Sequence, residues 1–256
     1  RRQYVTALVA GVFGALAGCT GDGTDRETTA ESTADTTTES VPDSTTETVA
    51  DEGGLPPPRT ETGEMIVAQA IESRRSRREY AAEALTAAEV GQLLWAGQGI
   101  TKHRPGRHGL RAAPSAGALY PLELFAAVGA NGVRGFEPGI YHYEPSEHAV
   151  ERRRSGDVRD RLATIAVEQS WIAAAPVVFV LTAVDERTTG KYGERGRRRY
   201  VPMEAGHVGQ NVYLQAEALG LSTVTVGAFR DDDLRDLLGV SAAHRPLSVM
   251  PVGKRN

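Results

Sequence analysis

Two short stretches of the sequence combine residue types that suit the binding of a flat, anionic ligand. The first runs from Arg74 to Arg78 and places four arginines around Ser76, directly after a segment with helical spacing. Guanidinium groups and a hydroxyl can together hold a phosphate or a carboxylate, because they donate several charge-assisted hydrogen bonds. The alternative is a solvated basic run, which is the commoner fate of charge clusters, and this stretch alone does not decide between the two.

The second stretch runs from Arg111 to Glu123 and reads RAAPSAGALYPLE, with Ala116, Gly117 and Ala118 in a row. Three small residues leave backbone N–H groups uncovered and allow a flat ligand to approach the chain closely. Pro121 stops any helix from continuing, so the stretch should lead into a strand. Considered alone, the stretch favours a plainer interpretation, an ordinary Gly/Ala turn before a strand.

The elements that must position these stretches follow from the spacing of apolar residues. Thr86 and Glu89 form a capping-box sequence that opens a helix through Trp95. Other helices are expected over residues 65–73, 157–167, 201–219 and 231–238, and strands over residues 122–128, 140–143, 177–184, 223–226 and 247–252. This order of elements, with no Gly-rich dinucleotide fingerprint, predicts an α+β fold and argues against a Rossmann fold.

The charge distribution divides the 256-residue chain into two unlike parts. Residues 1–64 carry 12 acidic and 4 basic side chains, whereas residues 65–256 carry 21 acidic and 25 basic ones. A mildly basic folded part suits an anionic ligand. No basic helix with interleaved aromatics is evident, so we expect no nucleic-acid partner. We also expect no metal site, because His103 and His108 lack a third ligand at fitting spacing.

Residues 1–19 have the order of charge, apolar run and cysteine that marks an export signal. Arg1 and Arg2 precede an apolar run that is too short to span a bilayer, and the segment ends in Leu-Ala-Gly-Cys. The arginine pair resembles a twin-arginine signal, and the ending resembles a lipobox in which Cys19 is lipidated. An apolar N-terminal helix with an incidental cysteine is the alternative. Cys19 is the only cysteine, so the folded part has no thiol nucleophile.

Residues 20–62 are rich in Thr, Ser, Asp and Glu and contain few apolar side chains. Such a segment cannot bury enough surface to offset the entropy lost on ordering. It is predicted to be a disordered tether between the signal segment and a single domain over residues 63–256.

A series of motifs in residues 64–253 carries a resemblance to a known family. The motifs are Arg74 to Arg78, Leu94 to Ile100 (LWAGQGI), Ala113 to Glu123 (APSAGALYPLE), Gly139 to Tyr143 (GIYHY), Lys191 to Gly196 (KYGERG), Glu204 to Asn211 (EAGHVGQN), Gly220 to Phe229 (GLSTVTVGAF) and Pro251 to Gly253 (PVG). Together they resemble the nitroreductase family of flavoproteins. Within it they are similar to the SagB-type dehydrogenase branch, which includes azoline oxidases that make thiazoles and oxazoles in peptides.

The resemblance implies an α+β fold in which helices flank a mixed sheet, and a homodimer with two FMN sites at its interface. The phosphate, ribityl chain and pyrimidine edge of FMN would be held by Arg74, Arg75, Ser76 and Arg78. Many nitroreductases continue past Pro-Val-Gly into an arm whose basic residue grips the phosphate. Here Lys254 and Arg255 could substitute for that arm, or the arginine cluster could suffice.

The resemblance also assigns the residues around the flavin ring. The ring would be lined from the other subunit by Pro114, Ser115, Ala116 and Ala118. The backbone around Gly227 and Ala228 would face flavin N5, the atom that accepts a hydride.

In azoline oxidases a Lys-Tyr pair is thought to assist loss of the substrate proton, and Lys191-Tyr192 is the candidate here. Arg199-Tyr200 is the rival pair, and an ordinary surface lysine is the alternative for Lys191. A base near the ring could remove a carbon-bound proton while hydride leaves for the flavin.

These observations predict an FMN-dependent oxidoreductase that transfers a hydride between a small organic or peptide-derived substrate and FMN. The protein is expected to be exported and lipid-anchored to the outer face of the cytoplasmic membrane. The alternatives are an NAD(P)H-dependent nitro- or quinone reductase and a non-catalytic flavin-binding surface lipoprotein. Nicotinamide cofactors are cytoplasmic, so an export signal weighs against the reductase.

Overall fold

The computed structural model of the chain describes residues 53–61, 65–105 and 109–256. Its helices are α1 (Val67–Ser73), α2 (Ala87–Gln98), α3 (Arg159–Ile165), α4 (Glu186–Tyr192), α5 (Val201–Ala218) and α6 (Asp231–Leu238). Its strands are β1 (Ile100–Lys102), β2 (Leu110–Arg111), β3 (Leu122–Val128), β4 (Gly139–Glu144), β5 (Ala149–Ser155), β6 (Val177–Val184), β7 (Leu221–Thr223) and β8 (His244–Lys254). The domain is therefore α+β, as the order of sequence patterns predicts.

Six strands form one sheet in the order β5-β4-β3-β6-β8-β7, and every pairing within it is antiparallel. The expectation of a mixed sheet is therefore wrong. The apolar run of β6 is buried on both faces, and such a run suits a covered strand of either direction. Strand direction is set by the connections between strands, which hydrophobic patterning does not reveal.

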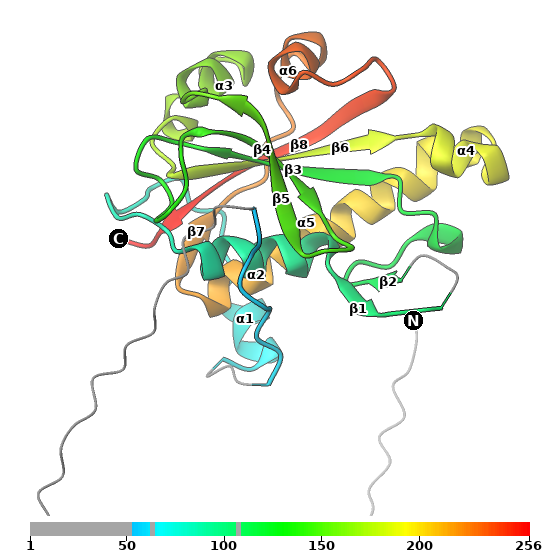
Figure 1. The fold of residues 1–256 in the computed structure, drawn as a ribbon, viewed down its shortest axis with the longest axis horizontal. Helices are drawn as coiled ribbons and strands as arrows, with labels where there is room; N and C mark the ends of the chain where they lie inside the picture. Colours follow the sequence, from blue (N-terminus) through cyan, green and yellow to red (C-terminus); the bar gives the residue numbers. More distant parts are fainter. Residues whose placement is uncertain (1–52, 62–64, 106–108) are drawn as a thin grey trace, which may run out of the picture. The chain divides into compact units, whose positions relative to one another are not determined.

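Helices cover both faces of this sheet, with α2 and α5 on one side and α3 and α6 on the other (Figure 1). Alternate residues of β6 serve the two layers: Phe179 and Leu181 pack with the α2/α5 side, whereas Val178 and Val180 pack with the α3/α6 side. This alternation is the period-2 geometry of a strand, and it makes β6 the centre of the fold.

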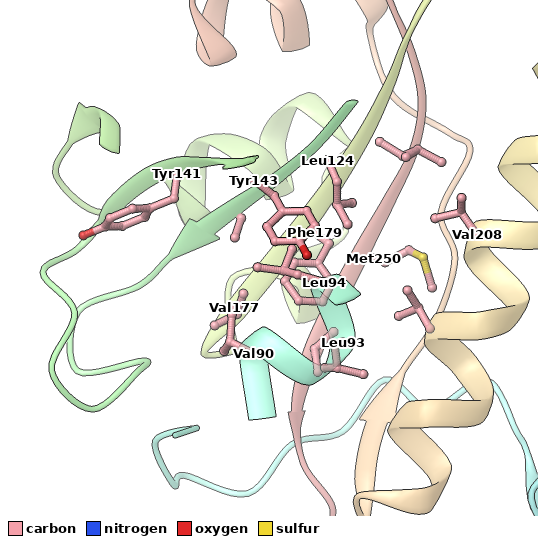
Figure 2. Packing of buried hydrophobic residues seen from close by; sticks show 14 of the residues in the cluster. Val90, Leu93, Leu94, Leu124, Tyr141, Tyr143, Val177, Phe179, Val208 and Met250 are labelled. Carbon is pink, nitrogen blue, oxygen red and sulfur yellow. The ribbon is translucent and has the colours of Figure 1, made fainter. Parts of the chain in front are cut away.

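The α2/α5 side of the core is packed around Phe179 (Figure 2). Leu94 of α2 and Tyr143 of β4 lie near its ring, and Val208 of α5 points towards Met250 of β8. Each of these side chains is less than 4% exposed. Burial of one such large apolar side chain contributes roughly 1.5–3 kcal/mol, so this layer holds α5 firmly on the sheet.

Helix α2 begins at the predicted capping box, which is confirmed. The Thr86 hydroxyl accepts from the Glu89 N–H at 3.2 Å, and the Glu89 carboxylate accepts from the Thr86 N–H at 2.9 Å. A Cβ added at Gly97 would lie 3.2–3.5 Å from side chains of Leu124, Val208 and Val212. A small residue at position 97 therefore lets α2 approach α5 closely.

Four elements were not expected from the sequence, namely the short strands β1 and β2, the edge strand β5 and helix α4. Residues 151–155 of β5 are exposed, so the strand lacks the apolar alternation that identifies a half-buried strand. Charged side chains on such an edge also discourage pairing with other chains. Helix α4 reads ERTTGKY and buries only Thr188, so its sequence shows no apolar face.

Residues 53–61 belong to the predicted tether, yet they contact the domain. The Gly53 carbonyl accepts from the Val150 N–H at 2.8 Å, and the Leu55 N–H donates to the His148 carbonyl at 3.2 Å. The Arg59 N–H donates to a side-chain oxygen of Gln92 at 2.8 Å. The predicted signal segment, Cys19 and the predicted tether up to residue 52 lie outside the described residues. No helix within the described ranges is both long and apolar enough to cross a membrane.

A buried acid on α5 anchors the segment that follows α1. Glu217 is 3% exposed, and its carboxylate lies 2.7 Å from Arg77 Nη1 and 3.0 Å from Arg255 Nη2. Burial alone would raise the pKa of Glu217, but hydrogen bonds from Arg77 and Ser73 and the Arg255 charge hold it below its ordinary value. Arg77 therefore serves the fold, unlike the other arginines of its cluster.

Replacement of Arg77 should test whether this arginine, unlike the others of the cluster, stabilises the fold. Arg77→Met should lower the free energy of unfolding by about 2 kcal/mol, because a buried carboxylate loses one of its two cations. Arg75→Met is the matched control, since exposed Arg75 donates only to backbone carbonyls of Glu72 and Arg74. Urea unfolding measures both variants, and equal losses of stability would contradict the assignment.

Candidate functional site

The segment from Arg74 to Arg78 forms a cluster of cationic groups beside α5. The Arg74 guanidinium lies 5.2 Å from the ring centre of Tyr213, and the Arg78 guanidinium lies 5.4 Å from a ring of Trp171. Within the described part of the chain, Arg74, Arg75 and Arg78 form no ion pair with a carboxylate. Guanidinium groups that remain unpaired are available to an anionic ligand.

Tyr213 of α5 joins this cluster to the segment that precedes α6. Its hydroxyl lies 3.1 Å from Ser76 Oγ and accepts from the Thr225 N–H at 2.7 Å. Further along that segment, Gly227 and Ala228 are exposed, and a Cβ added at Gly227 would meet no atom within 4 Å. The chain therefore presents open backbone next to the cationic cluster, as a flat ring would require.

The stretch of residues 114–120, called the shelf below, has an unusual backbone. Gly117, Ala118 and Tyr120 have φ values of 66°, 54° and 46°, in the left-handed region that residues with side chains rarely adopt. Ser115 holds the turn, since its carbonyl accepts from the Ala118 N–H at 3.1 Å and its hydroxyl from the Tyr120 N–H at 3.0 Å. Strain of this kind persists only where surrounding contacts impose it, and it concentrates at functional sites.

The C-terminal end of α4 places Lys191 and Tyr192 against the shelf. A Cβ added at Gly117 would lie 2.8 Å from the Tyr192 hydroxyl and 3.2 Å from Lys191 Nζ. The rival pair is placed differently, because Tyr200 packs edge-on against Tyr192 at 5.0 Å while Arg199 is exposed. Of the two predicted pairs, only Lys191-Tyr192 is thus in contact with Gly117.

Beneath the shelf lies a buried acid of α5, Glu204, which is 2% exposed. The Ser115 hydroxyl donates to its carboxylate, and Arg111 supplies the nearby positive charge. Burial raises the pKa of Glu204 to about 7, and the contributions of Ser115 and Arg111 only partly oppose this. One of its oxygens, Oε1, has no hydrogen-bond partner among the described residues. The shelf therefore rests on a carboxyl group that can hold a proton near neutral pH.

Within one chain the predicted cofactor residues form two groups along α5. Pro114 and Ser115 contact the first half of α5, at His207 (3.3 Å to the Pro114 carbonyl) and Glu204. Ser76 contacts the second half, at Tyr213. Glu204 and Tyr213 are nine positions apart on the helix, which is about 13.5 Å of rise. The chain thus presents two half-sites, the arginine cluster with Gly227 and Ala228, and the shelf with Lys191 and Tyr192.

Sequence analysis missed several residues that the structure places at these half-sites. Tyr213 and Trp171 contact the arginine cluster, but each is an ordinary apolar position in its own element. The sequence gives a weak indication of Glu204, because an acid among apolar helix positions needs a partner for its charge. Lys254 and Arg255 were the predicted substitutes for an arm that grips the phosphate. Both already form ion pairs, Lys254 with Glu89 at 2.5 Å and Arg255 with Glu217.

Two cavities accompany these features. A groove of about 470 Å³ lies between α1, α2 and α5 and is lined by residues that include Val67, Trp95 and Leu214. A larger cavity of about 650 Å³ lies on the α3/α6 side of the sheet and is lined by residues that include Glu123, His142 and His244. No shelf residue lines the larger cavity, so we do not place the predicted cofactor there.

The residues of the two half-sites fit FMN. Unpaired guanidinium groups and Ser76 suit its phosphate, and the open backbone at Gly227 suits its flat ring. The described residues contain no group of three His, Cys, Asp or Glu side chains that could hold a metal ion.

Comparisons with known proteins identify the family. The model described as Nitroreductase family matches residues 71–254, which is most of the chain. A relative from Methanocaldococcus jannaschii, named "Putative nitroreductase MJ1384", is 47% identical over 182 residues, covering 71% of this chain and 87% of that protein. This chain therefore belongs to the nitroreductase family and is a flavin oxidoreductase of that family.

More distant relatives process peptides. The Microcin B17-processing protein McbC of Escherichia coli is 29% identical over 124 residues, which cover 47% of this chain and 45% of McbC. The match thus spans less than half the length of that relative.

Two solved structures share the fold. A Ralstonia eutropha JMP134 protein, also named as a nitroreductase, has a TM-score of 0.67 at 24% identity, covering 79% of this chain and 88% of that one. A chain of the E. coli microcin synthetase McbBCD complex with truncated pro-MccB17 bound has a TM-score of 0.61 at 23% identity, covering 86% and 85%. Both confirm the predicted nitroreductase-like fold.

The raised pKa of Glu204 predicts a specific dependence of stability on pH. Between about pH 4.5 and pH 7 the folded protein holds a proton that the unfolded chain releases, so the unfolding free energy should fall as pH rises through this range. The contribution should be about 3 kcal/mol, and Glu204→Gln should remove it. Urea unfolding at pH 5 and pH 8 measures the effect, with exposed Glu194→Gln as control. Equal pH dependence in Glu204→Gln and the wild type would refute the buried-acid assignment.

Proposed function

We propose that this protein is an FMN-dependent dehydrogenase of the SagB type that oxidises a small organic or peptide-derived substrate, with azolines as the substrate class to test first. The observation that carries the proposal is the contact of Lys191 Nζ and the Tyr192 hydroxyl with Gly117 of the shelf. The similarity to McbC, a peptide-processing protein, also supports a peptide-derived substrate.

In the proposal, the arginine cluster binds the anionic end of FMN. Arg74 and Arg78 pack on aromatic rings, so their guanidinium groups are oriented before the ligand arrives. Ser76 is held by Tyr213 and would add a hydroxyl contact. Bound FMN would supply the hydride-accepting chemistry that the chain's own side chains lack.

We further propose that a second copy of the chain completes each FMN site. The separation of the two half-sites along α5 supports this, because a flavin at the arginine cluster of one chain needs a shelf from another. Four of the exposed large apolar side chains within the described ranges lie on or next to α1 and at the start of α5: Ile66, Val67, Ile71 and Met203. Val67 also lines the groove between α1, α2 and α5. Exposed apolar side chains grouped in this way mark a surface for association.

Lys191 is the proposed base of the reaction. An azoline becomes aromatic by losing two electrons and two hydrogens, one as a hydride equivalent and one as a proton. Lys191 Nζ would take the proton from the substrate carbon, and the Tyr192 hydroxyl, next to it at the shelf, would help to orient the substrate. Open space at Gly227 leaves room for the ring that the hydride must reach.

An NAD(P)H-dependent nitro- or quinone reductase is the second candidate, favoured by the 47% identity to a protein named as a nitroreductase. We also propose that the protein is exported and anchored by a lipid on Cys19 to the outer face of the cytoplasmic membrane. That proposal is supported by the order of residue types in residues 1–19 alone.

Anaerobic spectroscopy of the FMN-loaded protein tests the function. A thiazoline-containing peptide should bleach the visible flavin band, whereas NADH and NADPH should not. In Lys191→Ala the rate of bleaching should fall roughly 10²-fold or more with flavin content unchanged, because general-base catalysis contributes about that much.

Lys102→Ala is the matched control, since Lys102 is an exposed lysine of β1 to which the proposal gives no role. Bleaching by NADPH and not by any azoline would replace the proposed function with the reductase. An unchanged rate in Lys191→Ala would remove Lys191 from its role as the base.

A further inference from the structure

Arg187 ties helix α4 to the end of the shelf and to the start of β3. Its Nη1 donates to the Tyr120 carbonyl at 3.1 Å, and its Nη2 lies 2.5 Å from Glu123 Oε1. Tyr120 has a φ of 46°, a conformation that surrounding contacts must hold in place. A guanidinium group suits such a bridge, because its planar fork can donate in two directions at once.

The spacing of residues along α4 gives this bridge a consequence for Lys191. Arg187 and Lys191 are four residues apart, so their side chains leave the same face of the helix about 6 Å apart. Arg187 reaches the shelf at Tyr120, and Lys191 reaches it at Gly117. These two contacts on one face add to the buried Thr188 and to the ion pairs of Asp185 at the start of α4, and they fix the end of the helix that carries Lys191 against the shelf.

The anchor of Arg187 is itself rigid and charged. Glu123 is largely buried on β3, and its Oε2 lies 2.8 Å from Nε2 of His142 on the neighbouring strand β4. The other ring nitrogen of His142 lies 2.8 Å from Glu144. Burial alone would raise the pKa of Glu123, but the hydrogen bond from His142 and the charge of Arg187 hold it below its ordinary value. Arg187 therefore connects a short polar helix to the central sheet.

We propose that Arg187 is a positioning residue: it bridges Tyr120 and Glu123 and thereby fixes α4 so that Lys191 and Tyr192 stand at the shelf. This proposal rests on the proposed function, in which Lys191 takes the substrate proton. Arg187 acts through Lys191 and not on the substrate itself. Most of the effect of losing Arg187 should therefore disappear when Lys191 is already absent, and only the part that acts through Tyr192 should remain.

A double-mutant cycle measures this dependence with the substrate that bleaches the flavin. Arg187→Met should lower kcat about tenfold, with KM and flavin content unchanged, because a base displaced by a fraction of an ångström loses much of its effect. In a Lys191→Ala background the same substitution should change kcat less than about twofold. Glu123 keeps its bond to His142 in these variants, so no unpaired carboxylate is created.

Two further variants separate positioning from a loss of folding. Arg187→Lys keeps the charge but cannot donate in both directions, so it should restore only part of kcat. Arg198→Met is the matched control, because exposed Arg198 contacts only Glu194, at 3.5 Å, and should leave kcat unchanged. Additive losses in the double-mutant cycle would overturn the proposal.

Hydrogen exchange tests the positioning claim without any substrate. The amides of Thr189 and Gly193 donate within and at the end of α4, to Asp185 and Thr189. Their exchange should speed up about fivefold in Arg187→Met and stay unchanged in Arg198→Met. Unchanged exchange in Arg187→Met would overturn the proposal even if Lys191 proves to be the base. If exchange is faster in Arg187→Met but the enzyme is inactive with azolines or is reduced by NADPH, the positioning role of Arg187 stands. Only the proposed reaction is then rejected.

Discussion

Helix α5 is the constraint on which the arrangement of the site depends. It is held on the sheet by Val208 and Val212, and its two ends serve different half-sites. Tyr213 holds the arginine cluster and the open backbone at Gly227, whereas Glu204 lies under the shelf. Because the helix is stiff, these half-sites stay about two and a half helical turns apart within one chain. In the proposed function a second chain supplies the other half-site, so dimerisation is part of the proposed chemistry.

Three unusual structural features occur together in the few residues of the shelf. Its backbone turns left-handed at Ala118 and Tyr120, it covers a buried acid, and it receives the side chains of α4 at Gly117. The left-handed backbone and the buried acid cost stability, and the contacts of Ser115 and Arg187 help to hold them in place. The structure thus holds a small, bare piece of backbone open beside a lysine and a tyrosine. This is the geometry that a flat cofactor and its substrate would use.

The sequence predicted the covered strands β3 and β6 at their observed bounds, because unbroken apolar runs bounded by turn residues have few other structural solutions. It did not predict α4 or β5, since neither has an apolar face, and these include the helix that carries Lys191. Motif order placed the arginine cluster and the shelf in a known family, which the family comparison confirms. Contacts between distant residues, such as Tyr213 with Ser76 or Arg187 with Tyr120, depend on how the elements pack, and no local pattern encodes them.

Flavin content of mixed dimers tests the central claim most directly. One chain would carry Arg74→Ala with Arg78→Ala, the other Gly117→Val, and two different tags would isolate dimers that contain one copy of each. If the arginine cluster of one chain and the shelf of the other form each site, one site per dimer stays intact. The mixed dimer should then bind about half of the wild-type FMN, although neither variant alone retains it. Absence of FMN from the mixed dimer would show that both half-sites act within one chain and would contradict the account.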